Sequence, residues 1–262
     1  QYLEQAQKLT TVVFDKTGTL TKGEPSVTDI IGENKDEILR LAAIAEKGSE
    51  HPLGEAIVRA AREKGMVIKD AETFEAIPGH GIIVKAEGRE VLVGNRRLMH
   101  TNNIITDSLE QTLQSLEIQG KTAMIVAIDK KVVGIIAVAD TLKDHSTEAV
   151  AELKKMGIET IMLTGDNERT ANAIAKLVGI DKVIANVLPG GKVDVIKKLQ
   201  TEGKIVAMVG DGINDSPALA QSNIGIAVGS GSDVAKETGG IILVKDDLRD
   251  VVSGIILSRA TI

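Results

Sequence analysis

The second half of the chain alternates helical and strand-like segments with short polar breaks, and this alternation constrains the fold more than any other feature. Helical patterns occur at 146–157, 167–179, 192–200, 214–221 and 232–239, and strands rich in Val and Ile lie between or after them at 158–164, 182–187, 204–210, 224–228 and 241–244. Strands with such continuous apolar runs belong in a parallel sheet that helices cover on both faces. The sequence therefore predicts a Rossmann-type α/β domain.

The middle of the chain follows a different pattern. Alternating apolar runs at 82–93 and 124–138 are interrupted by Glu87-Gly88 and Asp129-Lys130, which are hairpin signals and predict antiparallel strands. Helical patterns at 36–47 and 52–64 precede these hairpins, and a last helical pattern places an apolar stripe on one face of 248–256. The expected organisation is an α+β domain, 26–136, inserted into a discontinuous α/β domain made of 1–25 and 137–262.

Composition and short motifs exclude several classes of function. A formal net charge of -6 argues against nucleic-acid binding, which needs a surplus of basic residues on one face. The absence of cysteine excludes disulfides and thiolate metal sites within this sequence. Its longest apolar runs are far shorter than the roughly 20 residues of a membrane-spanning helix. The GxxxxGK[ST] motif of P-loop NTPases does not occur.

Three predicted strands of the α/β domain each end near an aspartate, namely Asp15, Asp166 and Asp211. The ligand crevice of an open parallel sheet lies beyond the carboxyl ends of its strands, so we expect these acids to converge. Clustered carboxylates hold phosphate only through a bridging cation, and oxygen ligands suit Mg²⁺. Each aspartate alone could instead cap the following helix. The three together favour a phosphate and metal site.

The residues around these acids have the chemistry to bind a phosphoryl group. Lys16 and Lys192 supply positive charge, and the hydroxyl groups of Thr17, Thr19 and Thr164 can donate hydrogen bonds to phosphoryl oxygens. A carboxylate is a poor general base toward a hydroxyl group but an adequate nucleophile toward phosphorus. The position of Asp15 at the end of the first strand therefore suggests a covalent role.

Three motifs carry a resemblance to a known family. DKTGTLT at 15–21 resembles the phosphorylation motif of P-type ATPases, members of the haloacid-dehalogenase-like superfamily, and TGDN at 164–167 and GDGIND at 210–215 resemble its companion motifs. The resemblance implies a phosphorylation site of Asp15, Lys16, Thr17, Thr164, Gly165, Asp166, Lys192, Asn214 and Asp215. It also implies Mg²⁺ ligands at Asp15, Asp211 and the main-chain carbonyl of Thr17. The LPGGK segment at 188–192 lacks the acid that the family usually places before the lysine, but it keeps Lys192.

Within the superfamily that this chain resembles, the residue type two positions after the nucleophilic aspartate differs between pumps and phosphatases. Phosphatases of the superfamily carry a second aspartate there, which protonates the leaving group and activates water. This chain has Thr17 at that position. A phosphorylated Asp15 is therefore expected to be long-lived and turnover slow.

The inserted domain has its own resemblance. EKGSEHPLG at 46–54, GHG at 79–81 and VGNRR at 93–97 are similar to the nucleotide-binding features of heavy-metal-transporting P-type ATPases. A histidine before a proline can also simply begin a helix. The resemblance implies ATP contacts at Glu46, His51, Gly79, Gly81 and Asn95. Aromatic residues are 1% of the chain, so adenine is expected to lie against aliphatic surface and glycine backbone rather than in a stack. Phe74 is the one candidate for stacking, although its expected place is the core.

By this resemblance the chain is the catalytic portion of a heavy-metal pump, located on the cytosolic face of a membrane. The implied cofactors are ATP and Mg²⁺, and the implied partners are the transmembrane and actuator domains of the same full-length pump. Copper is the expected cargo, without a site for it in this sequence. Asp140 and Lys143 lie at the second crossing between the domains and form either a hinge or a solvated turn. A soluble phosphatase or phosphotransferase of the same fold and a non-catalytic nucleotide-binding regulatory module remain as alternatives.

Overall fold

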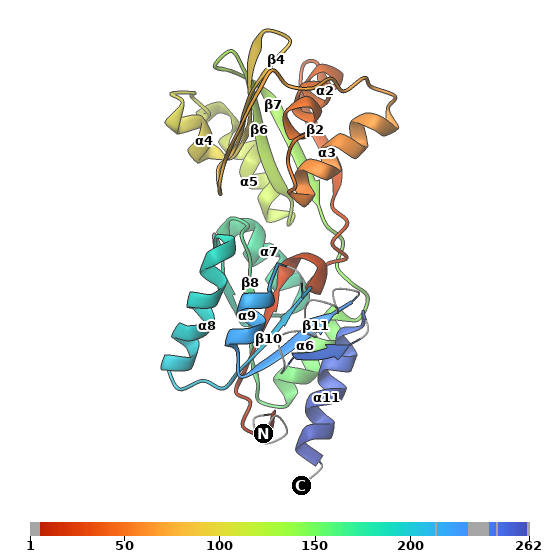
Figure 1. Ribbon diagram of the computed structural model, residues 1–262, viewed down its shortest axis with the longest axis vertical. Helices are drawn as coiled ribbons and strands as arrows, with labels where there is room; N and C mark the ends of the chain where they lie inside the picture. Colours follow the sequence, from red (N-terminus) through yellow and green to blue (C-terminus); the bar gives the residue numbers. More distant parts are fainter. Residues whose placement is uncertain (1–5, 213, 230–240, 245, 261–262) are drawn as a thin grey trace. The chain divides into compact units, whose positions relative to one another are not determined.

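The computed structural model describes residues 6–212, 214–229, 241–244 and 246–260. Tertiary contacts divide the chain into two compact units, one made of Gln1–Gly23 with Thr141–Ile262 and the other of Glu24–Asp140. The first unit thus contains both ends of the chain, and the second is inserted into it (Figure 1). The helical pattern at 232–239 lies outside the described residues.

The first unit is built on a six-stranded sheet in the order β12-β11-β10-β1-β8-β9, in which every pair of neighbours is parallel. Its strands are β1 Thr11–Asp15, β8 Glu159–Leu163, β9 Lys182–Ile184, β10 Val206–Gly210, β11 Ile224–Val228 and β12 Ile241–Val244. β1 lies between β8 and β10, and both of its faces are buried. This confirms the parallel α/β fold that the alternating pattern predicts.

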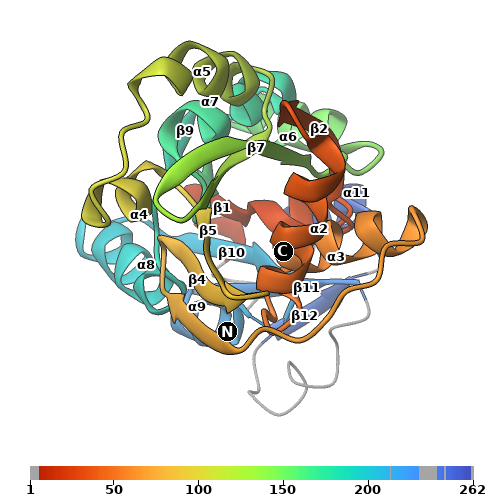
Figure 2. The same ribbon diagram turned by 90° about the horizontal axis from the view of Figure 1, so that it is seen from above.

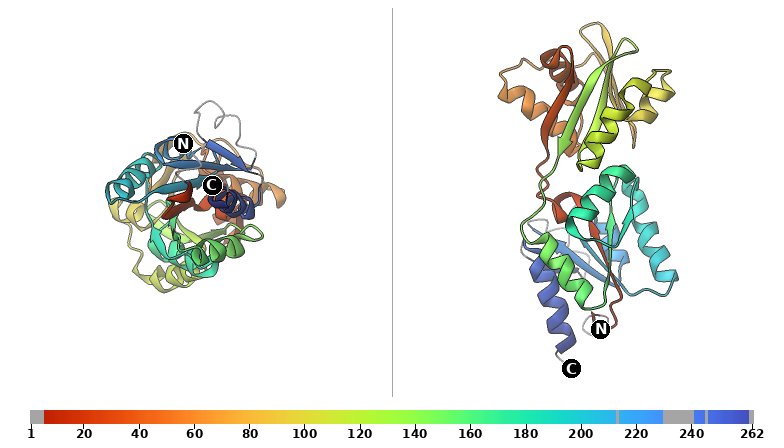
Figure 3. Two further views of the ribbon diagram at one scale, coloured as in Figure 1. Left: turned by 90° about the horizontal axis from the view of Figure 1, so that it is seen from below. Right: turned by 180° about the vertical axis from the view of Figure 1, so that it is seen from behind.

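Helices cover both faces of this sheet. The apolar side chains of α6 Ser146–Lys155, α7 Glu168–Val178 and α11 Leu248–Ala260 pack on one face, and those of α8 Lys192–Thr201 and α9 Ser216–Gln221 pack on the other (Figures 1 and 3). Two details of the sequence interpretation were wrong. Ile256 of the predicted stripe is exposed, and the strand expected at 182–187 ends at Ile184. Asn186 takes a left-handed conformation, which strands do not contain.

The second unit is an antiparallel sheet in the order β2-β7-β6-β5-β4-β3. Its strands are β2 Ser26–Gly32, β3 Thr73–Ile77, β4 Gly81–Ala86, β5 Arg89–Gly94, β6 Thr122–Ile128 and β7 Lys131–Ala139. Figure 2 views this sheet from above, with β2 beside β7. The hairpins predicted at 82–93 and 124–138 are present as β4–β5 and β6–β7.

Two pairs of helices enclose the sheet of the second unit. α2 Lys35–Glu46 and α3 Pro52–Glu63 pack on one face, whereas α4 Arg96–Thr101 and α5 Glu110–Ile118 pack on the other (Figure 3). Three short helical turns lie at Lys16–Leu20, Asp107–Leu109 and Pro189–Gly191. Among the residues with a described position, no helix is long and apolar enough to cross a bilayer.

Candidate functional site

The carboxyl end of β1 places the first functional side chain in the middle of the sheet. Asp15 is the last residue of β1 and pairs with Leu163 of β8, so Thr164 follows directly beside it. Phe14 pairs with Val209 of β10, so the loop that carries Asp211 begins on the other side of Asp15. The strand register therefore brings the three motifs of the sequence to one edge of the sheet, as the parallel arrangement predicts.

Lys192 links two of the carboxylates at this edge. Its ammonium nitrogen Nζ lies 2.7 Å from Oδ1 of Asp15 and 2.6 Å from Oδ1 of Asp215. Both aspartates are buried, and the Asp215 side chain has no exposed surface. Lys192 is the first residue of α8, so the helix fixes the origin of its long side chain. The ammonium group of Lys192 is thus held between Asp15, the candidate nucleophile, and Asp215.

Burial and neighbouring negative charges raise the pKa values of both carboxyl groups. Burial, together with the charges of Asp215 and Asp211, raises the pKa of Asp15 from its ordinary value of 3.8 to about 7, although Lys192 acts in the opposite direction. Burial also raises the pKa of Asp215. Burial alone lowers the pKa of Lys192, but the charges of Asp15 and Asp215 raise it above the ordinary value. Lys192 therefore stays charged, and the site around Asp15 holds an excess of negative groups.

The loop after β10 is folded tightly around Asp211. Asn214 donates to Asp211 from its backbone nitrogen at 3.1 Å and from Nδ2 at 3.3 Å, and the Asp211 backbone nitrogen donates to Oδ2 of Asp215 at 3.3 Å. A Cβ atom at Gly210 would lie 2.5 Å from Oδ2 of Asp215, so only glycine fits there. This explains the glycine of the GDGIND motif as a requirement of close packing.

The loop after β1 also depends on a glycine. Gly18 has φ +73°, a left-handed conformation that L side chains rarely adopt, and a Cβ atom on it would lie 3.5 Å from Cβ of Asp211. The loop that follows Asp15 therefore passes directly beside Asp211. Thr19 in the same loop is fully buried, and its hydroxyl group has no hydrogen-bond partner among the described residues.

Lys16 and the TGDN segment form a second ion pair of the site. Nζ of Lys16 lies 2.5 Å from Oδ2 of Asp166, and both side chains are about nine-tenths buried. The backbone nitrogen of Asp166 donates to the hydroxyl oxygen of the buried Thr164 at 3.1 Å. The charge of Lys16 is thus directed to Asp166, whereas Lys192 contacts Asp15. The sequence alone does not distinguish these two lysines.

The residues present fit a Mg²⁺ ion. Asp211 and Asp215 both raise the pKa of Asp15, so a cation there would relieve carboxylate repulsion. Mg²⁺ takes oxygen ligands, keeps several waters and needs only one or two carboxylates. In the described part of the chain no three His, Cys, Asp or Glu side chains are arranged to hold a metal by themselves. The ligand set of Asp15, Asp211 and the Thr17 carbonyl stays a prediction.

The structure adds Lys143 to the site. The sequence interpretation left this residue as part of either a hinge or a solvated turn. Lys143 is buried, donates from Nζ to the carbonyl oxygen of Gly18 at 2.6 Å, and pairs with Asp246. Its backbone nitrogen and the hydroxyl group of Ser146 both donate to the carbonyl oxygen of Leu20. A solvated turn is therefore wrong for Lys143. The 143–146 segment fastens the loop that follows Asp15.

Replacing Lys143 by methionine should loosen this loop. We expect the free energy of unfolding to fall by about 2 kcal/mol, because the Gly18 carbonyl loses a charge-assisted hydrogen bond in a buried place. Lys22→Met is the matched control, since Lys22 pairs with Asp144 only at 4.0 Å and both side chains are largely exposed. Urea unfolding measures both variants. Equal effects of the two substitutions would contradict the proposed fastening.

In the second unit, Glu46 and His51 lie on the connection between α2 and α3. Glu46 is the last residue of α2 and is buried, and burial raises the pKa of its carboxyl group to about 7, although a hydrogen bond with Ser49 acts in the opposite direction. A Cβ atom at Gly54 would lie 2.4 Å from Oε2 of Glu46, so the glycine makes room for the acid. Nδ1 of His51 accepts from the backbone nitrogen of Leu53 at 3.2 Å.

This last contact indicates the tautomer of the neutral His51 ring. An accepting Nδ1 carries no proton, so the ring proton of the neutral imidazole is on Nε2. The ring is exposed at the start of α3, where it caps the helix. Capping uses only one nitrogen, so the capping interpretation of His51 and the nucleotide-binding interpretation are compatible.

The other three candidates, Gly79, Gly81 and Asn95, lie together where β4 begins and β5 ends. Nδ2 of Asn95 donates to the carbonyl oxygen of Gly79 at 2.8 Å, and its Oδ1 accepts from the backbone nitrogens of Arg97 and Leu98. Gly81 has φ +140°, and a Cβ atom on it would lie 2.3 Å from the carbonyl oxygen of Val93. Asn95 and Gly81 therefore have structural roles that come in addition to any contact with a ligand.

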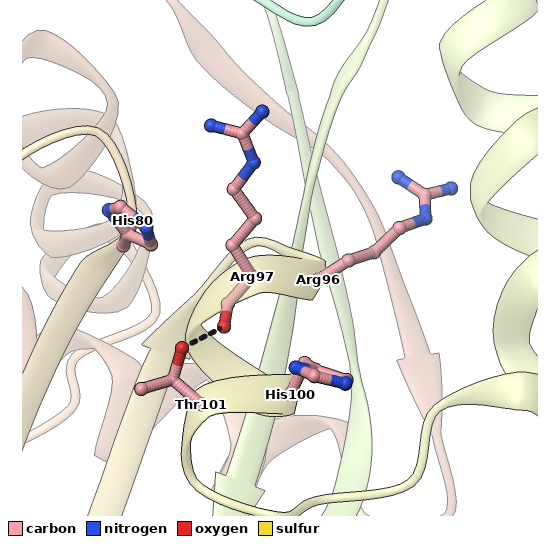
Figure 4. A pocket seen from close by; sticks show the side chains of 5 residues that line it. All are labelled: His80, Arg96, Arg97, His100 and Thr101. Carbon is pink, nitrogen blue, oxygen red and sulfur yellow. Dashed lines mark hydrogen bonds between the residues drawn. The ribbon is translucent and has the colours of Figure 1, made fainter.

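A shallow basic pocket borders these residues. It has a volume of about 360 Å³ and is lined by His80, Arg96, Arg97, His100 and Thr101 (Figure 4). Arg96 is engaged by Glu110 and Glu117 of α5, and its side chain diverges from that of Arg97 in the close view. The sequence interpretation used VGNRR as a motif but assigned no role to its arginines.

Comparisons with known proteins agree with the motifs. Residues 9–223 match the model of the haloacid dehalogenase-like hydrolase family. The chain is 56% identical over 99% of its length to a probable copper-exporting P-type ATPase of Archaeoglobus fulgidus and 50% identical over its whole length to a copper-exporting P-type ATPase of Bacillus subtilis. It spans about a third of the length of these curated relatives.

Two solved structures resemble the fold of the chain. A zinc-transporting PIB-type ATPase in its E2.Pi state is 41% identical with a TM-score of 0.66, over 99% of this chain and 42% of that one. The catalytic CPx-ATPase domain CopB-B is 30% identical with a TM-score of 0.68, over 98% of this chain and 91% of that one. The second comparison matches almost the whole of both chains.

Proposed function

Because the chain belongs to the haloacid dehalogenase-like hydrolase family, as a catalytic domain of the P-type ATPase kind, we propose that it is the ATP-hydrolysing unit of a heavy-metal pump. The names of its relatives favour copper export as the activity of the full-length protein. In that protein the transmembrane and actuator domains would be its partners, and this portion would lie on the cytosolic face of the membrane.

One observation carries the proposed chemistry: Lys192 bridges Asp15 and Asp215 in a buried site beside Asp211. An oxygen of the Asp15 carboxylate attacks the γ-phosphorus of ATP, the bond from that phosphorus to the β,γ-bridging oxygen breaks, and ADP leaves. Lys192 and Thr164 hold the phosphoryl oxygens, while Asn214 and Asp215 keep the loop of Asp211 in place. Mg²⁺, when held by Asp15, Asp211 and the Thr17 carbonyl, supplies positive charge against the phosphoryl oxygens.

The residue at position 17 supports a pump rather than a phosphatase. Thr17 cannot act as a general acid and base, so no carboxylate of the loop after β1 prepares water for attack on the phosphorylated Asp15. Hydrolysis of the phosphorylated form is then slow. A long-lived phosphorylated state leaves time for a conformational change in a transporter.

The second unit would hold the nucleotide through Glu46, His51, Gly79, Gly81 and Asn95. A carboxyl group with a pKa near 7 can both donate and accept a hydrogen bond, which matches the donor and acceptor on the edge of adenine. Nε2 of His51 would donate a further hydrogen bond to the nucleotide. The glycines let a ligand approach the backbone closely.

Labelling with radioactive ATP tests the proposed function. Incubation with γ-labelled ATP and Mg²⁺ should give a label on the protein that is stable in acid and released by hydroxylamine, and chelation of Mg²⁺ should prevent it. A soluble phosphatase would instead hydrolyse small phosphoesters rapidly without retaining label. A regulatory nucleotide-binding module would bind ATP without any label, and either result would contradict the proposal.

Replacing His51 by asparagine separates its two roles. Asparagine is a strong helix N-cap, so we expect the free energy of unfolding to change by less than about 0.5 kcal/mol. The affinity for a non-hydrolysable ATP analogue should fall about tenfold, since one hydrogen bond to the ligand is lost. Calorimetric titration measures the affinity. His145→Asn is the matched control, because His145 has φ +68°, which asparagine tolerates well. Unchanged affinity in His51→Asn would assign His51 to capping alone.

A further inference from the structure

Phe74 is an exposed aromatic side chain in a protein that has very few. The chain contains two phenylalanines, one tyrosine and no tryptophan. Phe14 is fully buried, whereas 46% of the Phe74 surface is exposed. The expectation that Phe74 belongs to the core is therefore wrong. A phenylalanine on the surface leaves a flat apolar face in contact with water, which is unfavourable unless something covers it.

The strand register shows which face of the sheet Phe74 occupies. Phe74 lies on β3, an edge strand that pairs only with β4 in its sheet, and its direct partner is Val84. Directly paired residues project from the same face. Val84 is buried beneath α2 and α3, so Phe74 lies on the face that these helices cover. This is the face that carries Glu46 and His51 on the connection between the two helices.

The ring is in contact with that connection. A Cβ atom at Gly48 would lie 3.2 Å from Cε2 and 3.3 Å from Cδ2 of Phe74, so the ring packs directly on the glycine backbone. Gly48 is two residues from Glu46 and three from His51. The ring is thus held beside two of the candidate nucleotide contacts while nearly half of its surface remains open.

The distance to the remaining candidates fits the length of a nucleotide. Phe74 is three residues before Ile77, which pairs with Gly81 at the other end of β3. Three residues of a strand cover about 10 Å. A ligand whose ring lies at Phe74 therefore has its sugar and phosphates within reach of the turn that contains Gly79 and Gly81.

We propose that the exposed face of Phe74, supported from below by Gly48, is the platform on which the adenine ring of the nucleotide stacks. This inference rests on the proposed function and adds a binding residue to it. Any base can stack on an aromatic side chain, because every base has a flat π-face. Loss of such a stack typically weakens binding by about tenfold to a hundredfold. Hydrogen bonds at Glu46 and His51 then select adenine, and Phe74 contributes affinity.

Fluorine NMR gives a direct test, because the chain has only two phenylalanines. The full chain labelled with 4-fluorophenylalanine should give one signal for each, and Phe74→Leu assigns them by removing one. Addition of the analogue AMP-PCP should shift the Phe74 signal through the ring current of adenine. Inorganic tripolyphosphate, which has no base, should leave that signal unchanged. Equal shifts with both probes, or no shift during AMP-PCP binding, would overturn the proposal.

Affinity measurements on variants test the same contact independently. Phe74→Leu should weaken AMP-PCP binding about tenfold or more, Phe74→Tyr should retain it, and Ile105→Ser at another exposed apolar position should not change it. Gly48→Ala should also weaken binding by displacing the ring, and it should have no further effect in the Phe74→Leu background. If AMP-PCP binds the unmodified chain but Phe74→Leu binds it equally well, the platform is refuted and the proposed function stands. If the unmodified chain does not bind AMP-PCP, both fail.

Discussion

Replacing Asp15 by asparagine should abolish labelling of the chain by ATP. Asparagine has nearly the same shape, but its neutral amide cannot form the acyl phosphate, so the loss should be complete within detection. The fold should not suffer. Burial raises the folded-state pKa of Asp15 from 3.8 to about 7, which means that the folded protein prefers the neutral form of this side chain.

The direction of this pKa shift predicts how the stability of Asp15→Asn compares with that of the unmodified chain at different pH values. The stability contributed by the protonated Asp15 is fully present below pH 3.8 and is lost as the pH rises through about 7. Asp15→Asn keeps a neutral group at all pH values, so it should be at least as stable as the unmodified chain at pH 8. Thermal unfolding at pH 5 and pH 8 measures this. A variant that is stable, binds AMP-PCP and still becomes labelled would show that Asp15 is not the acceptor.

Replacing Lys192 by methionine should have the second largest effect. The ammonium group contacts both Asp15 and Asp215, and its removal leaves two carboxylates together in a buried place. We expect the rate of phosphorylation to fall by at least about a hundredfold, which is typical for loss of a preorganised charge at a reacting centre. The pKa of Asp15 should also rise, because Lys192 is the group that lowers it. Rate measurements from pH 6 to pH 9 should therefore show the rise in rate at a higher pH in the variant.

Lys204→Met serves as the matched control for this variant. Lys204 pairs with Glu159 in the same unit, and Glu159 begins β8 at the opposite end of the strand from Thr164. Its replacement should leave the rate and its pH dependence unchanged. Lys192→Arg keeps the charge and should recover part of the rate. If Lys192→Met is phosphorylated at the normal rate, the bridge between Asp15 and Asp215 has no part in the chemistry.

Local patterns in the sequence were sufficient for much of the fold. The Val-rich and Ile-rich strands of the first unit and the two hairpins of the second unit follow from periodicity and from turn residues such as Asp129 and Lys130, which have φ +47° and +64°. β3 was not predicted, because an edge strand with four exposed residues lacks a buried face. The short helix α4 was not predicted either, since six residues carry too weak a periodic signal.

The site was predictable where it depends on the ends of strands and less so where it depends on long-range pairs. Convergence of Asp15, Thr164 and Asp211 follows from their positions after three neighbouring parallel strands. The contact of Lys143 with Gly18 joins residues 125 positions apart, and the choice of Lys16 for Asp166 joins residues 150 apart. No spacing in the sequence encodes such partners, because side-chain packing alone decides them.

Mapping the phosphorylated residue tests the central claim most directly. The chain is incubated briefly with ATP and Mg²⁺, quenched in acid and reduced with borohydride, which converts an aspartyl phosphate to homoserine. Mass spectrometry of the peptides then locates the change. The account predicts homoserine at position 15 and at no other aspartate. Homoserine at position 166, 211 or 215 with an unmodified Asp15 would contradict it.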